Sequence, residues 1–337
     1  MFKNNKIDFL AIGDIATDVF IKITAAEAKC DVNGEHCKLC LNFGGKIPYE
    51  SSEVCYATGN ASNVAVSTSR LGLHSALMTN VGGDENGFNC LNVLKKEKVD
   101  KNFVKVEKGV PTSYHYVLWY GQDRTILTKH EKFEYEWTKT KKSEEYHSPS
   151  WIYLTSIGEN SLRFHDEIVN YLKRHVNVKL AFQPGTFQIK LGCEQLKDFY
   201  QRANLFLCNH EEAQTILKNE TEDIPTLLKD IYKLGPKIVI ITNGLKGAYA
   251  YDGNDVWFIE SLPHTPFEST GAGDAFSSAF TTALILGKNI EEALLWGAID
   301  AMSVVTQVGP QKGLMTRNAI EEYIKNLDEN YKAKKIN

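Results

Sequence analysis

A short stretch in the last quarter of the chain combines a glycine-rich turn with an acidic residue. Gly271, Ala272, Gly273 and Asp274 open an apolar segment of small residues that we expect to be helical. Glycines lack a Cβ, so backbone N–H groups can approach an anion closely, and a helix N-terminus favours negative charge. Asp274 in the first turn could take a proton from an attacking hydroxyl. It could equally serve only to complement the helix dipole.

The elements that must hold this turn follow from short apolar runs and apolar periodicity. A strand at 7–12 ends at Gly13 and Asp14, and strand and helix patterns then alternate along much of the chain. Such alternation predicts a parallel sheet flanked by helices. Strands are expected at 7–12, 75–81, 151–155, 178–182, 205–208 and 238–242, and helices at 61–71, 86–97, 161–175, 191–202, 210–218, 223–234, 272–286 and 290–306.

Two segments depart from this alternation. Residues 17–57 are less regular, whereas 112–119 and 125–130 alternate like paired strands around a turn at 121–123. We therefore expect one domain over residues 1–337, with a small β lid formed by roughly 17–57 and 110–137.

Residues 270–274 resemble the second signature of the ribokinase-like, or PfkB, family of carbohydrate kinases. In that family the Asp is the catalytic base, here Asp274, and the Gly-Ala-Gly turn is the anion hole. The resemblance runs in order from about residue 7 to 325. It implies an α/β, ribokinase-like three-layer sandwich with a mainly parallel central sheet and a small β lid.

Two segments of the first half resemble the family's sugar-binding motifs. Residues 13–18 are similar to its first strand and turn, where the Asp at the place of Asp18 contacts sugar hydroxyls. Residues 58–63 are similar to its Gly-Gly-x-x-x-Asn helix start, which implies that Gly59, Asn60 and Asn63 hold the acceptor. Without the resemblance, the favoured interpretations of Asp18 and Asn63 are a strand-end turn and a helix cap.

Two segments of the second half resemble its nucleotide-binding motifs. Asn209 and Glu212 match an Asn-x-x-Glu that positions magnesium and phosphate, with Glu212 acting on Mg²⁺ through water. Thr242, Gly244 and Gly247 match a Thr-x-Gly-x-x-Gly nucleotide loop. The cofactors implied are ATP and Mg²⁺, and the motif set is more similar to the ATP-dependent than to the ADP-dependent branch. Without the resemblance, Glu212 would be interpreted as a solvated helical residue and Thr242 as an ordinary strand end.

Three positions bear on how far the resemblance extends. Glu268 stands where many relatives have an Asp that helps to hold a monovalent cation, which leaves such a cation open. Residues 182–186 replace a stretch that contains Asp and Asn in many relatives. Arg124, in the turn of the lid, is a candidate for closing over the phosphate.

Seven cysteines are present, and three of them lie within eleven residues. Cys30, Cys37 and Cys40, with His36 or Cys55 as a fourth ligand, could form a structural zinc site. The alternative is a set of reduced thiols that pack the lid. We expect free thiols or metal ligands rather than disulfides, because the chain has the features of a cytoplasmic protein.

Composition excludes several other classes. A net charge of −4 gives no electrostatic footprint for nucleic acid or an anionic membrane. No apolar run approaches the length of a membrane span, and the first apolar stretch is too short for a signal peptide. The basic segment 332–335 reads as a solvated tail.

The function expected is therefore an ATP- and Mg²⁺-dependent kinase of a small sugar, ribose- or fructose-like. A nucleoside kinase is the alternative, because lid aromatics could stack a base. They could instead pack the lid on itself or on a second subunit, as in a homodimer. A non-catalytic binder of sugars or nucleosides and a metal-regulated scaffold are alternatives of other classes. The aromatics are Tyr114, Tyr116, Trp119, Tyr120, Phe133, Tyr135 and Trp137.

Overall fold

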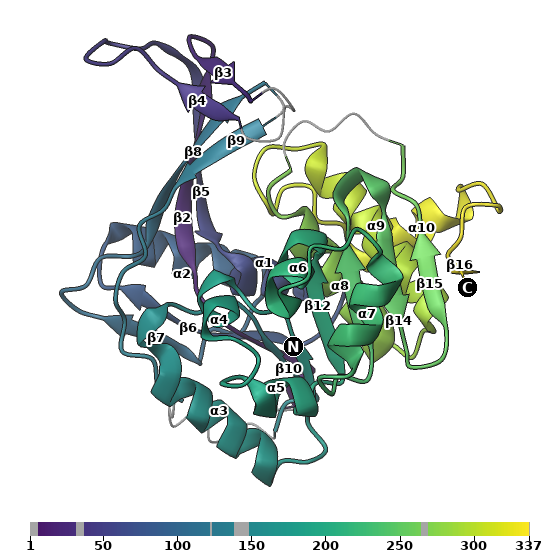
Figure 1. Cartoon of the computed structure of the whole chain (residues 1–337). Helices are drawn as coiled ribbons and strands as arrows, with labels where there is room; N and C mark the ends of the chain where they lie inside the picture. Colours follow the sequence, from purple (N-terminus) through teal and green to yellow (C-terminus); the bar gives the residue numbers. More distant parts are fainter. Residues whose placement is uncertain (1–5, 32–36, 122, 138–147, 264–268, 337) are drawn as a thin grey trace.

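A large sheet with helices on both faces forms the body of the chain, and a smaller sheet projects from it (Figure 1). The structure is a computed structural model that describes residues 6–31, 37–121, 123–137, 148–263 and 269–336. The large sheet has the order β16-β15-β14-β13-β12-β11-β10-β1-β6-β7. Neighbours are parallel from β7 to β13, and β13 to β16 are antiparallel. Its strands are β1 (Phe9–Ile12), β6 (Ser75–Gly82), β7 (Val104–Glu107), β10 (Trp151–Leu154), β11 (Lys179–Phe182), β12 (Leu205–Asn209), β13 (Val239–Thr242), β14 (Ala248–Tyr251), β15 (Val256–Ile259) and β16 (Lys334–Ile336).

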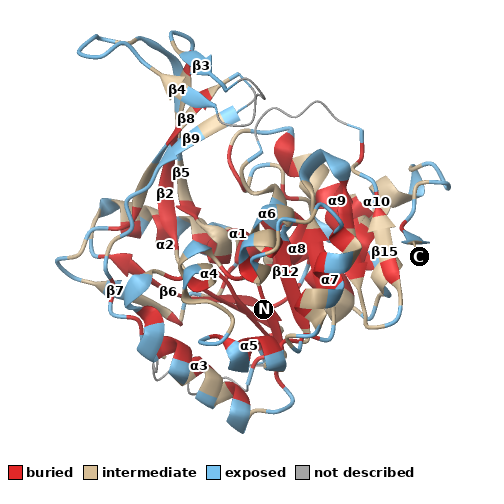
Figure 2. Ribbon diagram, viewed as in Figure 1, coloured by how far each residue is buried: buried red, intermediate tan, exposed pale blue. Residues whose placement is uncertain are grey.

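Two apolar cores lie on the two faces of this sheet (Figure 2). Phe9 and Ala11 of β1 belong to one core, and Leu10 and Ile12 belong to the other. A strand that is buried on both faces must be apolar throughout, which explains the uninterrupted run at 9–12. The predicted three-layer α/β architecture with a lid is confirmed. The first core is covered by α1 (Asn60–Arg70), α2 (Glu85–Lys96), α8 (Ala272–Ile285), α9 (Ile290–Val305) and α10 (Arg317–Lys325), and the second by α3 (Leu162–Arg174), α4 (Thr186–Leu191), α5 (Lys197–Arg202), α6 (His210–Leu217) and α7 (Ile224–Tyr232).

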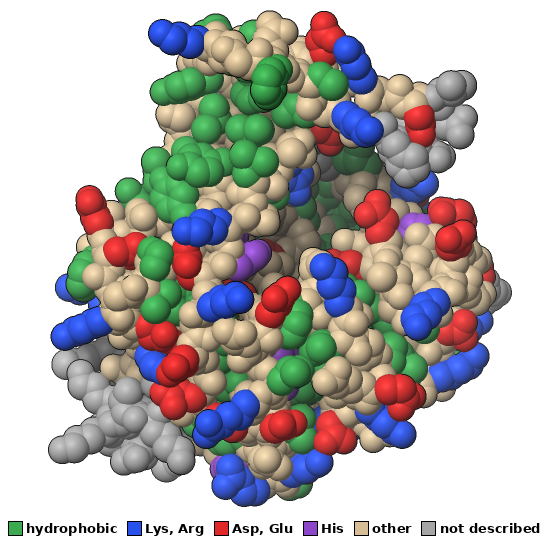
Figure 3. All heavy atoms as spheres, turned by 60° about the vertical axis from the view of Figure 1, so that its left-hand side comes forward, with side chains coloured by type: hydrophobic (Ala, Val, Ile, Leu, Met, Phe, Trp, Pro, Cys, Tyr) green, Lys and Arg blue, Asp and Glu red, His purple; other side chains and the backbone are tan. Residues whose placement is uncertain are grey.

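The lid is a sheet of order β5-β2-β8-β9. Asp18 lies opposite both Cys55 and His115, so these three share the face toward the large sheet. The next register position places Val54 and Tyr116 on the outward face, where Figure 3 shows hydrophobic side chains gathered. The strands are β2 (Ala16–Ile23), β5 (Tyr49–Thr58), β8 (Tyr114–Tyr120) and β9 (Asp123–Leu127), and a hairpin of β3 (Glu27–Lys29) and β4 (Lys38–Cys40) forms the tip.

Three predictions about individual elements are wrong. The helix expected at 191–202 begins only at Lys197, because α4 ends at Leu191 and is followed by Gly192, which has a φ of 84°. The strand expected at 125–130 ends at Leu127. The basic segment 332–335 is not a tail, since β16 pairs with β15 and Lys335 lies 2.6 Å from Asp255.

The predicted lid also contained three aromatic residues that pack elsewhere. Tyr135 stacks on Phe164 of α3, and Trp137 stacks on Tyr171 of the same helix. Phe133 is buried in the same core as Tyr135. These residues therefore stabilise the body of the protein, since α3 would otherwise expose its apolar face.

The cysteine cluster is also different from the prediction. Cys30 and Cys37 form a disulfide, which removes two of the three proposed zinc ligands. Within the described ranges no three His, Cys, Asp or Glu residues are grouped for a metal ion, and His36 lies outside those ranges. Cys40, Cys55 and three further cysteines are not bonded in disulfides. None of the helices that the structure describes combines the length and the apolar character needed to cross a membrane.

Candidate active site

Two adjoining cavities lie where the parallel strands end. Asp14, Ser156 and Asn209 each stand at or just beyond the carboxyl end of a strand and line the first cavity, of about 370 Å³. A second cavity of about 350 Å³ shares Thr242 and Gly273 with the first. This edge is where open α/β sheets bind ligands. Of the residues predicted from sequence, the first cavity is lined by Asp18, Gly59, Asn60, Asn63, Asn209, Glu212, Thr242, Gly271, Gly273 and Asp274, and the second by Thr242, Gly244, Gly247, Ala272 and Gly273.

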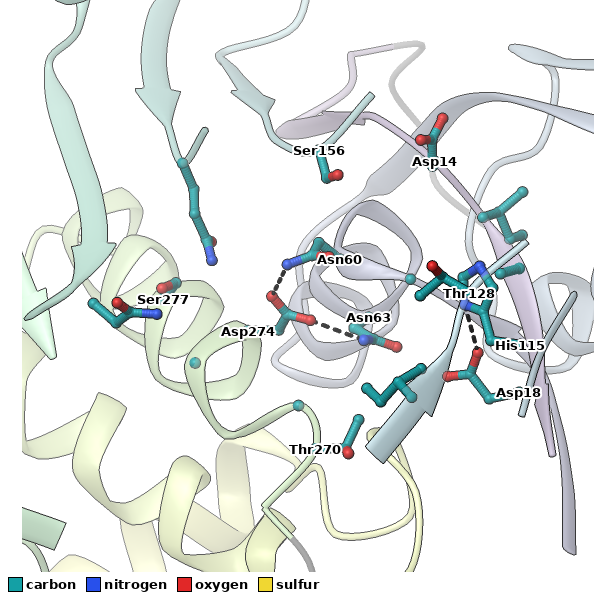
Figure 4. Close-up of a pocket in the computed structure, with 18 of the residues that line it drawn as sticks. Asp14, Asp18, Asn60, Asn63, His115, Thr128, Ser156, Thr270, Asp274 and Ser277 are labelled. Atoms are coloured by element: carbon teal, nitrogen blue, oxygen red, sulfur yellow. Dashed lines mark hydrogen bonds and ion pairs between the residues drawn. The ribbon is translucent and has the colours of Figure 1, made fainter. Parts of the chain in front are cut away.

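Asp274 lies in the first turn of α8 and is held by two amides from α1 (Figure 4). Asn60 Nδ2 donates to Oδ1 at 3.0 Å, and Asn63 Nδ2 donates to Oδ2 at 2.8 Å. The side chain is 7% exposed. Burial raises the pKa of Asp274 to about 6, against the hydrogen bonds from Asn63, Asn60 and Gln183 that lower it. A carboxylate with this pKa is basic enough to accept a proton near neutral pH while it remains ionised.

The two glycines beside Asp274 differ in the space that surrounds them. Gly271 caps α8 with a φ of 86°, and a Cβ there would lie 2.5 Å from Pro310 Cβ. A Cβ on Gly273 would meet only open space. The first N–H groups of a helix have no acceptor within the helix, so this end of α8 can receive an anion from the junction of the two cavities.

The far end of the first cavity is polar. Asp18 Oδ1 lies 3.1 Å from His115 Nδ1, and the His115 ring meets His130 edge-on at 4.8 Å between centroids. Tyr135 donates to Asp14 Oδ1 at 2.6 Å, and burial raises the pKa of Asp14 to about 6. Asp14 belongs to the sequence motif at 13–18, but the sequence predicted no role for it or for either histidine. The register of β2 and β8, which brings His115 to Asp18, had no signal in the sequence.

Asn209 and Glu212 form a reciprocal cap at the start of α6. The Glu212 N–H donates to Asn209 Oδ1, and the Asn209 N–H donates to Glu212 Oε2, both at 2.8 Å. Burial raises the pKa of Glu212, and the negative charge of Asp274 raises it further. The Glu212 carboxylate lines the first cavity, where it fits a hydrated Mg²⁺, which prefers oxygen ligands.

The second cavity has a narrow backbone loop at one end and apolar walls. Gly247 has a φ of 100°, and a Cβ there would lie 2.1 Å from the carbonyl oxygen of Ile259. Only glycine therefore allows the loop at 244–247 to pack beside β15. Side chains of α9 complete the wall and leave a slot that fits a flat, largely apolar ring. The apolar lining includes Ile259, Phe276, Ala298, Ala301, Met302 and Val305.

The lid reaches the glycine turn through Arg124. Arg124 lies on β9, lines the first cavity, and donates from Nη1 to the hydroxyl of Ser269. A guanidinium is thereby placed beside the N-terminus of α8, where it adds positive charge to that of the helix dipole. Glu268 lies outside the described residues, so the monovalent cation remains a prediction.

Several known proteins are similar to this chain in sequence or in structure. A ribokinase of Bacillus subtilis is 27% identical over 270 residues, which cover 79% of this chain and 87% of that protein. A nucleoside kinase of Methanothermobacter thermautotrophicus is 24% identical over 265 residues, covering 76% and 80%. The structure of Arabidopsis thaliana ribokinase complexed with ribose and ATP superimposes with a TM-score of 0.77 and 18% identity, covering 95% and 99%. Residues 24–317 match the model of the pfkB family carbohydrate kinases. The chain therefore belongs to the PfkB family of sugar and nucleoside kinases, ATP-binding phosphotransferases that act on an alcohol group.

Proposed function

We propose that this enzyme transfers the terminal phosphoryl group of ATP to a hydroxyl of a small neutral sugar, with Asp274 as the base. The observation that carries the proposal is the place of Asp274. It is buried in the wall of the first cavity at the N-terminus of α8, next to Gly273, which lines both cavities, and both its carboxylate oxygens are held by amide donors. An acceptor hydroxyl from the first cavity and a phosphoryl group from the second would meet at this point.

The reaction follows from the positions of these groups. The acceptor oxygen attacks the γ-phosphorus, the bond between that phosphorus and the β–γ bridging oxygen breaks, and ADP leaves. Asp274 takes the hydroxyl proton. The N–H groups after Gly271 and the guanidinium of Arg124 stabilise the charge on the transferred group. Glu212 and Asn209 would hold Mg²⁺, which neutralises phosphate charge when bound.

Polarity of the first cavity favours a sugar. Asp18, Asn60 and Asn63 line it, together with Asp14 and His115, and among the residues that the structure describes no Tyr, Trp or Phe lines it. His115 Nε2 is buried and lacks a hydrogen-bond partner among the residues described. A hydroxyl of the phosphate-accepting substrate would supply that partner. Within the described parts of the chain, Arg124 is the one Lys or Arg that lines the cavity, and it lies at the glycine turn. A neutral polyol fits this surface better than an acid or a phosphate ester.

A nucleoside is the second candidate, and one observation favours it. A further cavity of about 460 Å³ adjoins the first through Asp14 and Ser156, and it is lined by Tyr135 and Phe187. A base attached to a ribose in the first cavity could extend into this space. Of the lid tyrosines predicted to stack a base, Tyr135 lines this further cavity, whereas Tyr114, Tyr116 and Tyr120 line none of the three.

The outward face of the lid supports a homodimer. Val54, Tyr116 and Leu127 are 44%, 45% and 52% exposed, and they lie on this face beside Val19. An exposed apolar sheet face is a typical protein contact surface, and a second copy offers a matching one. The dimer should appear in sedimentation and be weakened by Tyr116→Glu.

The decisive experiment measures ADP release with ATP and Mg²⁺ against ribose, fructose, other keto sugars, adenosine, cytidine and inosine. Turnover with a pentose or hexose supports the sugar proposal, and turnover with nucleosides alone replaces it with the second candidate. If the folded protein binds an acceptor without releasing ADP, the chain is a non-catalytic binder. Asp274→Asn provides the control, because it should keep binding and lose turnover.

A further inference from the structure

The loop between α9 and α10 reaches the active site through one side chain. Gln311 Nε2 donates to the carbonyl oxygen of Ala57 at 2.6 Å and to Asn63 Oδ1 at 3.1 Å. Asn63 in turn donates from Nδ2 to Asp274 Oδ2 at 2.8 Å. A continuous chain of hydrogen bonds therefore connects a backbone carbonyl, two amides and the base.

The direction of this chain is fixed at its first member. The Ala57 carbonyl can only accept, so the Gln311 atom that faces it must be the nitrogen. Asn63 must then turn its oxygen toward Gln311, which leaves its NH₂ group for Asp274. Ala57 has a φ of 58°, which is unusual for a residue other than glycine. Its carbonyl also accepts a hydrogen bond from Ser62 Oγ, which helps to hold it in place.

The Gln311 backbone is anchored separately from its side chain. Arg70 Nη1 donates to the carbonyl oxygens of Gln311 at 2.7 Å and Leu314 at 2.9 Å. The same guanidinium binds Glu97 through Nε at 2.8 Å and Nη2 at 3.0 Å. Arg70 holds the pKa of Glu97 below its usual value, as expected for a charged pair of this geometry. The loop is therefore tied to α1 and α2 and has little freedom to withdraw the Gln311 side chain.

We propose that Gln311 is a positioning residue for proton transfer, which fixes the Asn63 amide so that its NH₂ group donates to the Asp274 carboxylate. This inference rests on the proposed role of Asp274. Without Gln311 the Asn63 amide can rotate and bring its oxygen against the carboxylate. The charged form of Asp274 then loses a hydrogen bond, so the base becomes protonated at a higher pH.

The test is the pH profile of kcat/KM for Gln311→Glu, which keeps the size of the side chain but offers no NH₂ group, and for Gln311→Leu. We expect the acidic limb to move up by about one pH unit, since one hydrogen bond to a charged group is lost. Turnover at pH 6 should fall about fivefold, because the ionised fraction of Asp274 falls from about one half to about one tenth, with the KM for ATP unchanged. Lys312→Gln is the matched control, because Lys312 lies on the same loop but pairs with Glu53 of the lid at 2.5 Å. Its profile should stay that of the wild type.

Repeating the measurement in an Asn63→Ala enzyme distinguishes this positioning role from a purely structural role of Gln311. If Gln311 acts through Asn63, then Gln311→Leu should have no further effect on the acidic limb in an Asn63→Ala enzyme. An unmoved limb in both Gln311 variants, or an equal effect in both backgrounds, overturns the proposal. Full activity of Asp274→Asn would instead overturn the proposed function. Other titratable groups near Asp274 must be fitted together with it. Burial raises the pKa values of Tyr153 and Glu212, and the charge of Asp274 raises them further. The remaining groups around the cavities are Asp14, Asp18, His115, His130 and Arg124.

Discussion

Replacing Asp274 by Asn should make the protein more stable and nearly inactive. The substitution keeps the shape of the side chain and removes the buried charge. Loss of a general base lowers turnover by about 10²- to 10⁴-fold. Wild-type kcat/KM should rise with pH through about 6, where Asp274 loses its proton, and the variant should lack this limb.

The gain in stability follows from the pKa of the base. Asp274 has a pKa of about 6 in the folded protein against an ordinary value of 3.8. Folding therefore favours the protonated form, and above pH 6 the buried carboxylate costs about 3 kcal/mol of the free energy of unfolding. The cost decreases as pH falls through 6, and about half of it remains at pH 5.

Asparagine offsets part of this gain. The Asn60 and Asn63 amides both donate to Asp274, and an amide in its place can accept at only one of its two polar atoms. One lost hydrogen bond removes about 1 kcal/mol. The net gain of about 2 kcal/mol at pH 8 corresponds to about 3 °C in Tm for a chain of this size.

Calorimetry at pH 8 and pH 5, together with ADP release over the same range, tests both parts. The Tm difference should be larger at pH 8 than at pH 5. A variant that is less stable than the wild type at pH 8 would refute the burial of an ionised Asp274. A variant with the wild-type pH profile would refute its role as the base.

Three further substitutions test the rest of the site. Asp14→Asn should raise the KM of the acceptor about 10-fold without changing the KM for ATP, because it weakens one hydrogen bond to a charged group; an unchanged acceptor KM would place Asp14 outside the binding surface. Gly247→Ala should cost about 2–4 kcal/mol of stability and abolish ATP binding, because the new Cβ would clash with Ile259. Gly72→Ala is its control and should cost about 1 kcal/mol, since Gly72 has a φ of 96° but open space around it. Equal costs for the two variants would contradict the steric explanation. Arg124→Gln should lower kcat about 100-fold with an unchanged Tm, and a wild-type kcat would show that the contact with Ser269 serves only to close the lid.

The parallel part of the fold could be predicted because its signals are local. A strand such as 151–154 is buried on both faces and therefore apolar throughout, and helices begin and end at polar or glycine residues. The antiparallel edge could not be predicted in the same way. β16 is a three-residue strand with two lysines, and its place depends on pairing with β15 about 78 residues earlier. The Cys30–Cys37 disulfide was also missed, since spacing alone does not distinguish it from a metal site.

The candidate site could be predicted as a set of residues but not as a set of contacts. Motif order identified Asn60, Asn63 and Asp274, and the structure brings all three together. The sequence separates Asn63 from Asp274 by 211 positions, so nothing local shows that the two asparagines hold the base in the absence of an acceptor. Gln311 had no signal at all, because a loop glutamine is usually solvated.

The class of acceptor depends on which face of β8 is turned inward. Alternation along 114–120 predicts two faces, one with Tyr114 and Tyr116 and one with His115. Both faces also carry apolar residues, so polarity does not show which of them meets the cavity. A shift of one residue would exchange them, and it would turn a polar surface into an aromatic one. The register with β2 places His115 beside Asp18 and the tyrosines outside. Two of the aromatic residues that suggested a nucleoside, Tyr114 and Tyr116, are therefore better explained as part of the outward face of the lid, and the inward histidine is what favours a sugar.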